Sequence, residues 1–286
     1  MKIKFSSVFL FFSILFITGC TSTEIDSVKN NDVKISELKN IAVYADTPDI
    51  SLRKTLETLL TKEFLKYEKN AKESIDFIPP LKKYSFDEIQ FELKKNNFDG
   101  VLIFSVLKYG KEYSGSSILS NGTFLYSVPD YNFVACFDAE LFELKTSTVA
   151  LKATLNSESE NNLDSILKSV AKKIVKEIME LEYSEILDCL KSEILENYVA
   201  IEIENKKNES LFSMQKPIFK AAVENTGVVL TFDTSIKNLT DKNDFLKFIQ
   251  NDDKGSYYSA TIRSKNDIQI LLELLEQIVE KMKSYE

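Results

Sequence analysis

Three cysteines and no histidine limit the nucleophilic chemistry open to this chain. Without histidine, Ser-His-Asp and Cys-His nucleophile pairs and the usual zinc sites are excluded. Cys136 and Cys189 lie far apart in the sequence. They could pair in an oxidising compartment, or they could remain two separate buried thiols. The sequence favours separate thiols, one on a strand and one on a helix.

Two acidic stretches could hold a proton or a cation. Asp46, Asp49 and Arg53 lie close together, but they fall between a predicted strand and a predicted helix, where Asp49 or Ser51 would cap the helix. Residues 251–255 superficially resemble a calcium loop, yet they lack the ligand spacing and the closing Glu of an EF-hand. No glycine-rich phosphate loop follows a predicted strand. The sequence therefore predicts no cofactor and no metal site.

The first residues have the order of a secretion signal. Lys2 and Lys4 form a short positive region, and Val8–Ile17 is an apolar run too short to span a membrane as a helix. The run ends in Ile-Thr-Gly-Cys at positions 17–20, which resembles the lipobox of bacterial lipoproteins. That resemblance implies cleavage before Cys20 and transfer of a diacylglycerol to its thiol. The alternative is a plain N-terminal anchor with an incidental cysteine.

The net charge of the chain limits the kinds of partner that it can bind. The net charge is −8, and no basic tract is present, which argues against nucleic acid and against electrostatic docking to anionic lipid. The membrane affinity would have to come from the lipid on Cys20, since two or three acyl chains give stable anchoring. Thr21, rather than Asp, follows the cysteine. If the host has two membranes, the sorting rule of enteric lipoproteins then implies the periplasmic face of the outer membrane.

Hydrophobic periodicity predicts an α/β fold behind a tether. Residues 1–19 are the signal peptide, residues 20–34 a flexible polar tether, residues 35–197 an α/β domain, and residues 198–286 a smaller α/β unit. In the larger domain we expect strands at 40–45, 75–78 and 101–107, helices at 52–67 and 86–96, a hairpin or loop at 109–129, strands at 132–144 and 149–156, and helices at 162–182 and 184–196. In the smaller unit we expect strands at 198–203, 228–232 and 257–262 and helices at 217–224, 241–250 and 265–284. The fold class is thus a β-α-β-α-β mixed sheet followed by antiparallel strands and a helix, with a second α/β unit.

Aromatic residues gather in the glycine-broken stretch from Tyr109 to Phe133. Rings in such a stretch could bind a partner protein of the envelope. Alternating aromatic residues are also ordinary strand residues, so the rings could instead pack on their own hairpin. The candidate partner-binding residues are Tyr109, Tyr113, Phe124, Tyr126, Tyr131 and Phe133.

Residues 40–182 resemble a group of envelope lipoprotein domains. The segments that carry the resemblance are NIAVYADTPD, LRKTLETLLTKEFL, FDGVLIFSVLKYG and VACFDAELFELKTSTVALKATL. The group includes the N-terminal domain of the Tol–Pal system protein TolB and the curli-export lipoprotein. The resemblance implies a part in an assembly or export machine, without catalysis. The curli pore needs two membrane hairpins per subunit, and only Tyr109–Pro129 is a candidate here.

The sequence as a whole predicts a lipid-anchored, non-enzymatic binding or assembly component of the bacterial cell envelope. A first alternative is a lipid-anchored enzyme of unfamiliar type that uses only Asp, Glu, Lys or Tyr. A second is a periplasmic binder of a small ligand, held in a cleft between the two units.

Overall fold

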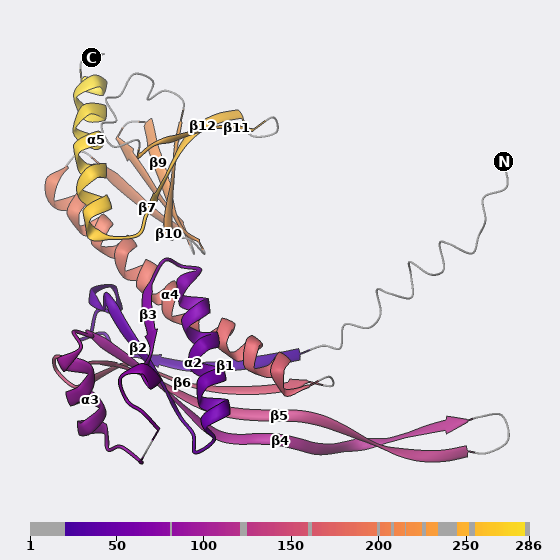
Figure 1. Cartoon of the computed structure of the whole chain (residues 1–286). Helices are drawn as coiled ribbons and strands as arrows, with labels where there is room; N and C mark the ends of the chain where they lie inside the picture. Colours follow the sequence, from indigo (N-terminus) through magenta and orange to yellow (C-terminus); the bar gives the residue numbers. More distant parts are fainter. Residues whose placement is uncertain are drawn as a thin grey trace, which may run out of the picture. The chain divides into compact units, whose positions relative to one another are not determined.

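The computed structural model describes most of the chain from Thr21 to Lys283 (Figure 1). The described residues are 21–80, 82–120, 125–159, 162–198, 201–206, 209–214, 216–224, 227–233, 245–251 and 255–283. They form two compact units, one with the residues up to Val33 and Leu38–Val175, the other with Lys34–Glu37 and the residues from Lys176 onward. The division falls inside a helix, whereas the sequence predicted a boundary between residues 197 and 198.

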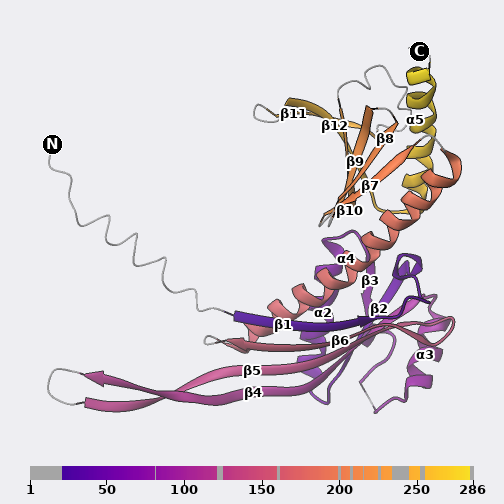
Figure 2. The same cartoon turned by 180° about the vertical axis from the view of Figure 1, so that it is seen from behind.

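The first unit is built on a six-stranded mixed sheet (Figures 1 and 2). Its elements are β1 (Thr21–Lys29), β2 (Asn40–Asp46), α2 (Ile50–Leu65), β3 (Asn70–Glu73), η3 (Ser74–Asp76), α3 (Phe86–Lys95), β4 (Gly100–Ser120), β5 (Leu125–Glu143), β6 (Thr148–Ser159) and the first part of α4 (Leu163–Asn197). The strand order is β1-β6-β5-β4-β2-β3. β2 pairs in parallel with β3 and β4, and the other neighbours are antiparallel. The predicted α/β class with a mixed sheet is confirmed.

β2 lies inside the sheet because apolar side chains cover both of its faces. Ala42 and Tyr44 pack with α3, in a cluster that includes Ile89 and Leu93. Since neighbouring strand residues point to opposite faces, the buried Ile41 and Val43 belong to the other face. A strand with two buried faces needs helices on both sides, which α2 and α3 supply.

Local capping fixes where the two short helices begin. The Asp49 carboxylate accepts hydrogen bonds from the backbone N–H groups of Ser51 (2.9 Å) and Leu52 (3.1 Å) at the start of α2. At the start of α3, Ser85 and Glu88 form the reciprocal capping box that their spacing predicts. The prediction of an N-cap role for Asp49 is therefore confirmed.

The predicted tether over residues 20–34 is wrong, because Thr21–Lys29 forms the edge strand β1. β1 pairs antiparallel with β6, from Thr21 opposite Ser159 to Lys29 opposite Leu151. Alternate side chains of β1 are half-buried and exposed. The segment has few apolar residues, but its period of two places Thr, Ile and Ser on one face, and their partners lie more than a hundred residues away in the sequence.

β4 and β5 continue beyond the sheet as a two-stranded ribbon, which extends far to the right in Figure 1 and to the left in Figure 2. β6 ends at Ser159, opposite Phe133 of β5, whereas β4 and β5 stay paired as far as Ser120 and Leu125. Two register shifts interrupt this pairing, one after Val106 and one after Tyr113. We use the name ribbon for the part of β4 and β5 beyond the Lys111–Phe133 pair.

The second unit is an antiparallel sheet of six strands with helices. Its strands are β7 (Glu202–Lys206), β8 (Glu209–Met214), β9 (Lys216–Glu224), β10 (Gly227–Asp233), β11 (Lys247–Asn251) and β12 (Gly255–Ile262), in the order β11-β12-β10-β9-β8-β7. The final helix is α5 (Lys265–Lys283). The short helix η2 (Ile35–Glu37) belongs to this unit, where the backbone N–H groups of Ile35 and Ser36 donate to the Glu185 carboxylate on α4.

Two helices predicted in the second unit are wrong. Residues 217–224 lie in β9, since a helix of this length is marginal by itself, whereas strand pairing stacks Phe219 between Phe212 and Phe232 (ring centroids 4.4 and 5.2 Å apart). Of residues 241–250, the first four lie outside the described residues and the last four belong to β11, which pairs with β12. The unit is still α/β, as predicted.

α4 is one helix of 35 residues, where the sequence predicted two. The predicted break near residue 183 contains neither proline nor glycine. Tyr183 and Ile186 are both buried, so the apolar side of the helix continues across that point.

Candidate functional site

The end of the first sheet at which the ribbon begins is also the end at which β1 starts. Thr21 is opposite Ser159, Ser159 is opposite Phe133, and Phe133 is opposite Lys111. These four residues therefore form one row across β1, β6, β5 and β4. The described part of β1 starts at this end with Thr21, the residue that follows Cys20 in the sequence.

Hydroxyl groups hold the first residues of β1 to β6 and α4. Thr21 Oγ1 lies 3.1 Å from the hydroxyls of both Ser159 and Ser165. Thr23 Oγ1 lies 2.8 Å from Ser157 Oγ and 2.7 Å from Ser169 Oγ. Ser159 and Ser165 are themselves hydrogen-bonded, at 2.9 Å. We call these six residues the hydroxyl cluster. It fixes β1 from its first described residue.

The structure brings three of the six predicted aromatic residues, Tyr113, Tyr131 and Phe133, together at the base of the ribbon. Tyr113 and Tyr131 are paired across the strands, and their rings meet edge to face with centroids 6.0 Å apart. They are 65% and 51% exposed. The Lys111 ammonium lies 5.0 Å from the centroid of the Phe133 ring, which is half-buried. Two exposed tyrosines and a lysine thus stand where the ribbon leaves the sheet.

Tyr109 belongs more to the body of the unit than to the ribbon. It pairs with Ala135 and is half-buried. Burial raises the pKa of its phenol above the ordinary value, and the carboxylates of Asp164 and Asp49 add to this shift. The phenol of Tyr109 is therefore neutral at physiological pH. Tyr126 lies in β5 opposite Leu119, and Phe124 lies outside the described residues.

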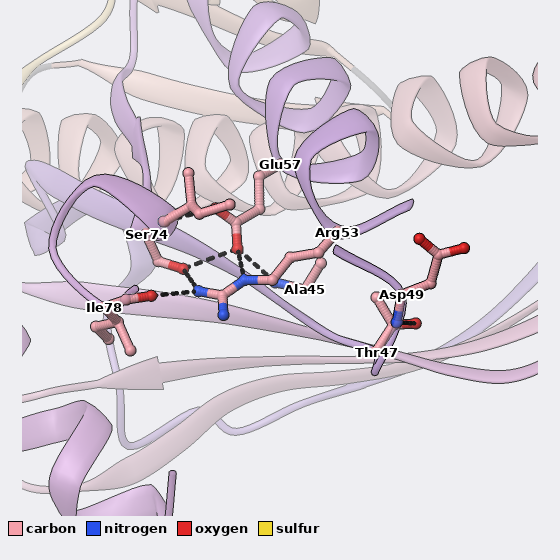
Figure 3. A network of polar contacts seen from close by, with 8 residues as sticks. Ala45, Thr47, Asp49, Arg53, Glu57, Ser74 and Ile78 are labelled. Atoms are coloured by element: carbon pink, nitrogen blue, oxygen red, sulfur yellow. Dashed lines mark hydrogen bonds and ion pairs between the residues drawn. The ribbon is translucent and has the colours of Figure 1, made fainter. Parts of the chain in front are cut away.

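A buried ion pair forms the centre of a polar network in the first unit (Figure 3). Arg53 Nε donates to Glu57 Oε1 at 2.8 Å, one helical turn apart on α2. Glu57 also accepts from the backbone N–H groups of Ala45 and Ile75 and from the Ser74 hydroxyl. Arg53 Nη2 donates to Ser74 Oγ and to the Ile78 carbonyl, both at 3.0 Å. The side chains of Arg53 and Glu57 are 4% and 0% exposed.

This network is built to hold the unit together. Both Glu57 oxygens already accept hydrogen bonds from the protein, and the guanidinium also stacks over the Tyr44 ring, 4.6 Å from its centroid. Burial raises the pKa of the Tyr44 hydroxyl, while Arg53 opposes that shift. The sequence pattern grouped Arg53 with Asp46 and Asp49 and did not indicate its partners Glu57 and Ser74. The available signal was the four-residue spacing of Arg53 and Glu57 on one helical face.

The remaining predicted site residues stand apart. Cys136 on β5 and Cys189 on α4 are free, half-buried thiols that belong to different units. Asn251 and Gly255 are a paired position of β11 and β12, and residues 252–254 lie outside the described residues. Within the described ranges, no cluster of three or more Cys, Asp or Glu side chains could hold a metal ion. In the same ranges, no helix is long and apolar enough to cross a membrane.

Comparison with known proteins gives only loose structural likeness. No protein-family model matches the chain, and no curated protein matches it. Among solved structures, PelC from Paraburkholderia phytofirmans, solved as a dodecamer, is 12% identical and covers 55% of this chain and 97% of its own, with a TM-score of 0.38. Lipoprotein GNA1162 from Neisseria meningitidis is 13% identical and covers 49% of this chain and 96% of its own, with a TM-score of 0.28. A PDZ domain protein from Parabacteroides distasonis is 13% identical and covers 76% of this chain and 42% of its own, with a TM-score of 0.30. At such TM-scores no functional argument follows.

Proposed function

We propose that the protein is a lipid-anchored component of the bacterial cell envelope, with a non-enzymatic role in binding or assembly. The observation that carries the proposal is the position of Cys20. The sequence that ends at it resembles a lipobox, and the residue that follows it, Thr21, is the first described residue and already belongs to β1. Cleavage before Cys20 would remove residues 1–19 and leave every described strand and helix intact.

A binding role is favoured by the surface that the first unit presents. The ribbon carries the exposed Tyr113–Tyr131 pair, and large exposed aromatic side chains often anchor partners. The buried ion pair of Arg53 and Glu57 is enclosed, and both side chains already have protein partners. If the host has two membranes, Thr21 after the lipidated cysteine favours the periplasmic face of the outer membrane. The partners are then the membrane, through the lipid, and an envelope protein.

Acyl labelling tests the anchor. Cells that express the protein are fed a labelled fatty acid, and the labelled protein is detected after purification in detergent. We expect the Cys20→Ala protein to lose all label and to retain residues 1–19. The variants Cys136→Ala and Cys189→Ala are matched controls, since each removes one half-buried cysteine elsewhere and should keep the label. Label that persists in Cys20→Ala would refute the proposal.

A further inference from the structure

The helix α3 covers only part of one face of the first sheet (Figure 1). Among the described residues, the apolar cluster beneath α3 includes strand residues of β2, β4 and the end of β5, but none of β6 or β1. On the opposite face, Thr23 of β1 contacts Ser169 of α4. Since neighbouring strand residues point to opposite faces, Glu24, Asp26 and Val28 point to the α3 face, and all three are exposed. The β1 end of this face is therefore open to solvent.

Three aspartates form a row across this open face. Its members, in successive strands β1, β6, β5, β4 and β2, are the paired residues Asp26, Thr154, Asp138, Ser105 and Asp46. Directly paired residues share one face of a sheet, and Asp46 lies two residues from Tyr44, which packs beneath α3. Each aspartate is two strands from the next, a distance of about 10 Å. We call Asp26, Asp138 and Asp46 the acidic row.

The acidic row keeps its negative charge. Thr154 Oγ1 donates a hydrogen bond to Asp138 Oδ1 at 2.8 Å, so a hydroxyl and not a cation stands beside this carboxylate in the row. The nearby Lys152 forms its ion pair with Glu140, at 2.7 Å. Among the described residues, no lysine or arginine forms an ion pair with a member of the acidic row. The potentials of the three carboxylates therefore add across the sheet and attract a cationic partner.

The spacing of the acidic row suits a helix with basic residues along one side. Residues seven apart in a helix lie on the same side, about 10.5 Å from each other, which is close to the distance between neighbouring aspartates of the row. Val28 is 72% exposed on the same face, two residues from Asp26, and offers apolar surface to such a helix. A second copy of this chain is a poor partner, because the chain has a net charge of −8 and its own acidic row would face the first.

We propose that the acidic row is a docking site for a basic helix of an envelope protein, with lysine or arginine residues seven apart lying over Asp26, Asp138 and Asp46. This inference rests on the proposed binding role and deepens it, because it adds a second contact surface and states the charge of the partner. The lipid on Cys20 has no part in the argument.

A synthetic helix tests the proposal. The probe is a fluorescently labelled, alanine-rich peptide with lysines at positions i, i+7 and i+14. Its binding to the full-length protein, purified in a non-ionic detergent, is measured by fluorescence anisotropy at about 25 mM salt, where screening is weak. We expect the double variant Asp26→Asn with Asp138→Asn to bind the peptide about five- to tenfold more weakly. Asparagine keeps the side-chain oxygen that accepts from Thr154, and circular dichroism checks the fold.

The matched control removes the same charge from the opposite face of the sheet. Asp164 on α4 and Glu63 on α2 both belong to the first unit. We expect the double variant Asp164→Asn with Glu63→Gln to bind the peptide as the wild type does. A second control is a peptide of the same composition with lysines five residues apart, which places them on different sides of the helix. We expect this peptide to bind the wild type more weakly than the probe.

Selective weakening in the Asp26→Asn, Asp138→Asn variant supports the docking site. Equal weakening in the two double variants would overturn it, because the peptide would then respond only to net charge. Equal binding of the second peptide, or displacement of the probe by spermine at the same charge concentration, would show that any polycation suffices and would overturn the helix. Absence of binding at low salt would also refute the proposal. The acyl label on Cys20 is measured separately, so none of these outcomes bears on the lipid anchor.

Discussion

The first unit contains two polar networks, the Arg53–Glu57 network and the hydroxyl cluster, which differ in charge and in burial. The Arg53–Glu57 network encloses a pair of opposite charges, and every oxygen of Glu57 has a partner. The hydroxyl cluster joins neutral side chains at a sheet edge, where β1 is only half-buried. Removing one partner from the Arg53–Glu57 network leaves a buried charge unpaired. Removing one from the hydroxyl cluster leaves only a neutral hydroxyl without its hydrogen bond.

The difference indicates which part of the sheet can open. An unpaired buried charge costs several kcal/mol, while one hydrogen bond between neutral groups contributes only about 0.5–1.5 kcal/mol net. The β2–β3 side of the sheet should therefore resist local opening. The β1 edge should open at much lower cost. The edge that carries the proposed anchor is the weaker of the two.

The largest expected effect comes from the buried pair. Glu57→Ala leaves the Arg53 guanidinium buried without its carboxylate, so we expect the free energy of unfolding to fall by about 3–5 kcal/mol. Urea denaturation followed by circular dichroism measures this loss. Glu63→Ala is the matched control on the same helix, because Glu63 pairs with the exposed Lys66 and should contribute about 1 kcal/mol or less. Equal losses in the two variants would contradict the structural role of the Arg53–Glu57 network.

A smaller effect is expected at the sheet edge. Thr23→Val keeps the shape of the side chain but removes the hydroxyl that contacts Ser157 and Ser169, at a cost of about 1–2 kcal/mol. Because β1 opens locally, the loss should appear as faster hydrogen exchange of its amides, with about tenfold for each 1.4 kcal/mol. Amides of β2 should be unchanged. Uniform acceleration across the sheet would mean that β1 is not a separate, weaker edge.

The sequence predicted the interior of the first unit better than its edge. Asn40–Ala45 and the Ser85–Glu88 capping box are local signals, and both appear in the structure where they were expected. The pairing of Thr21–Lys29 with β6 is not local, since Thr23 and Ser157 are 134 residues apart. No window of sequence contains both partners, so a polar segment was interpreted as a tether. The hydroxyl cluster was missed for the same reason.

Tertiary pairing also decided the second unit against local preference. Ala221 and Ala222 favour a helix by propensity, yet they lie in β9 between β8 and β10. In the candidate site, the sequence identified Tyr113 and Tyr131 but not that their strands belong to one sheet with the segment that starts at Thr21. That arrangement depends on the register of four strands, which alternation alone does not fix.

A hydroxyl on α2 provides a test in which removing a hydroxyl should not destabilise the protein. Thr61 Oγ1 is a buried atom with no hydrogen-bond partner among the described residues. Thr61→Val makes the same substitution as Thr23→Val, but the hydroxyl that it removes forms no hydrogen bond with the described residues. We expect no loss of stability, or a gain of up to about 1 kcal/mol, in the same urea experiment. A loss as large as that of Thr23→Val would show that a change of shape, rather than hydrogen bonding, explains both results.

The smallest effect is expected from an exposed ion pair, Lys82 with Glu88, which differs from Arg53–Glu57 mainly by its contact with water. The hydrogen bond from the Lys82 ammonium, followed by that from the Ser85 backbone N–H, lowers the pKa of Glu88. The same hydrogen bond, which the Lys82 ammonium donates to the Glu88 carboxylate, raises the pKa of Lys82. A lowered carboxyl pKa stabilises the folded state above the unfolded value of about 4.3, and this contribution is lost as the pH falls through the folded pKa. The raised lysine pKa stabilises the folded state below about 10.4, and its contribution is lost as the pH rises through the folded pKa.

The pair should therefore contribute only between these limits, and less in high salt, because exposed charges are screened. Melting temperatures of the wild type and Glu88→Gln, measured from acid to neutral pH, should differ near neutrality and converge in acid. The difference should be smaller than the Thr23→Val effect, and added salt should reduce it. The Glu57→Ala loss should hardly respond to salt, because its charges are enclosed by protein. A salt response of equal size in Glu57→Ala would mean that water reaches the Arg53–Glu57 network. The proposed difference between this enclosed network and the more easily opened β1 edge would then be wrong.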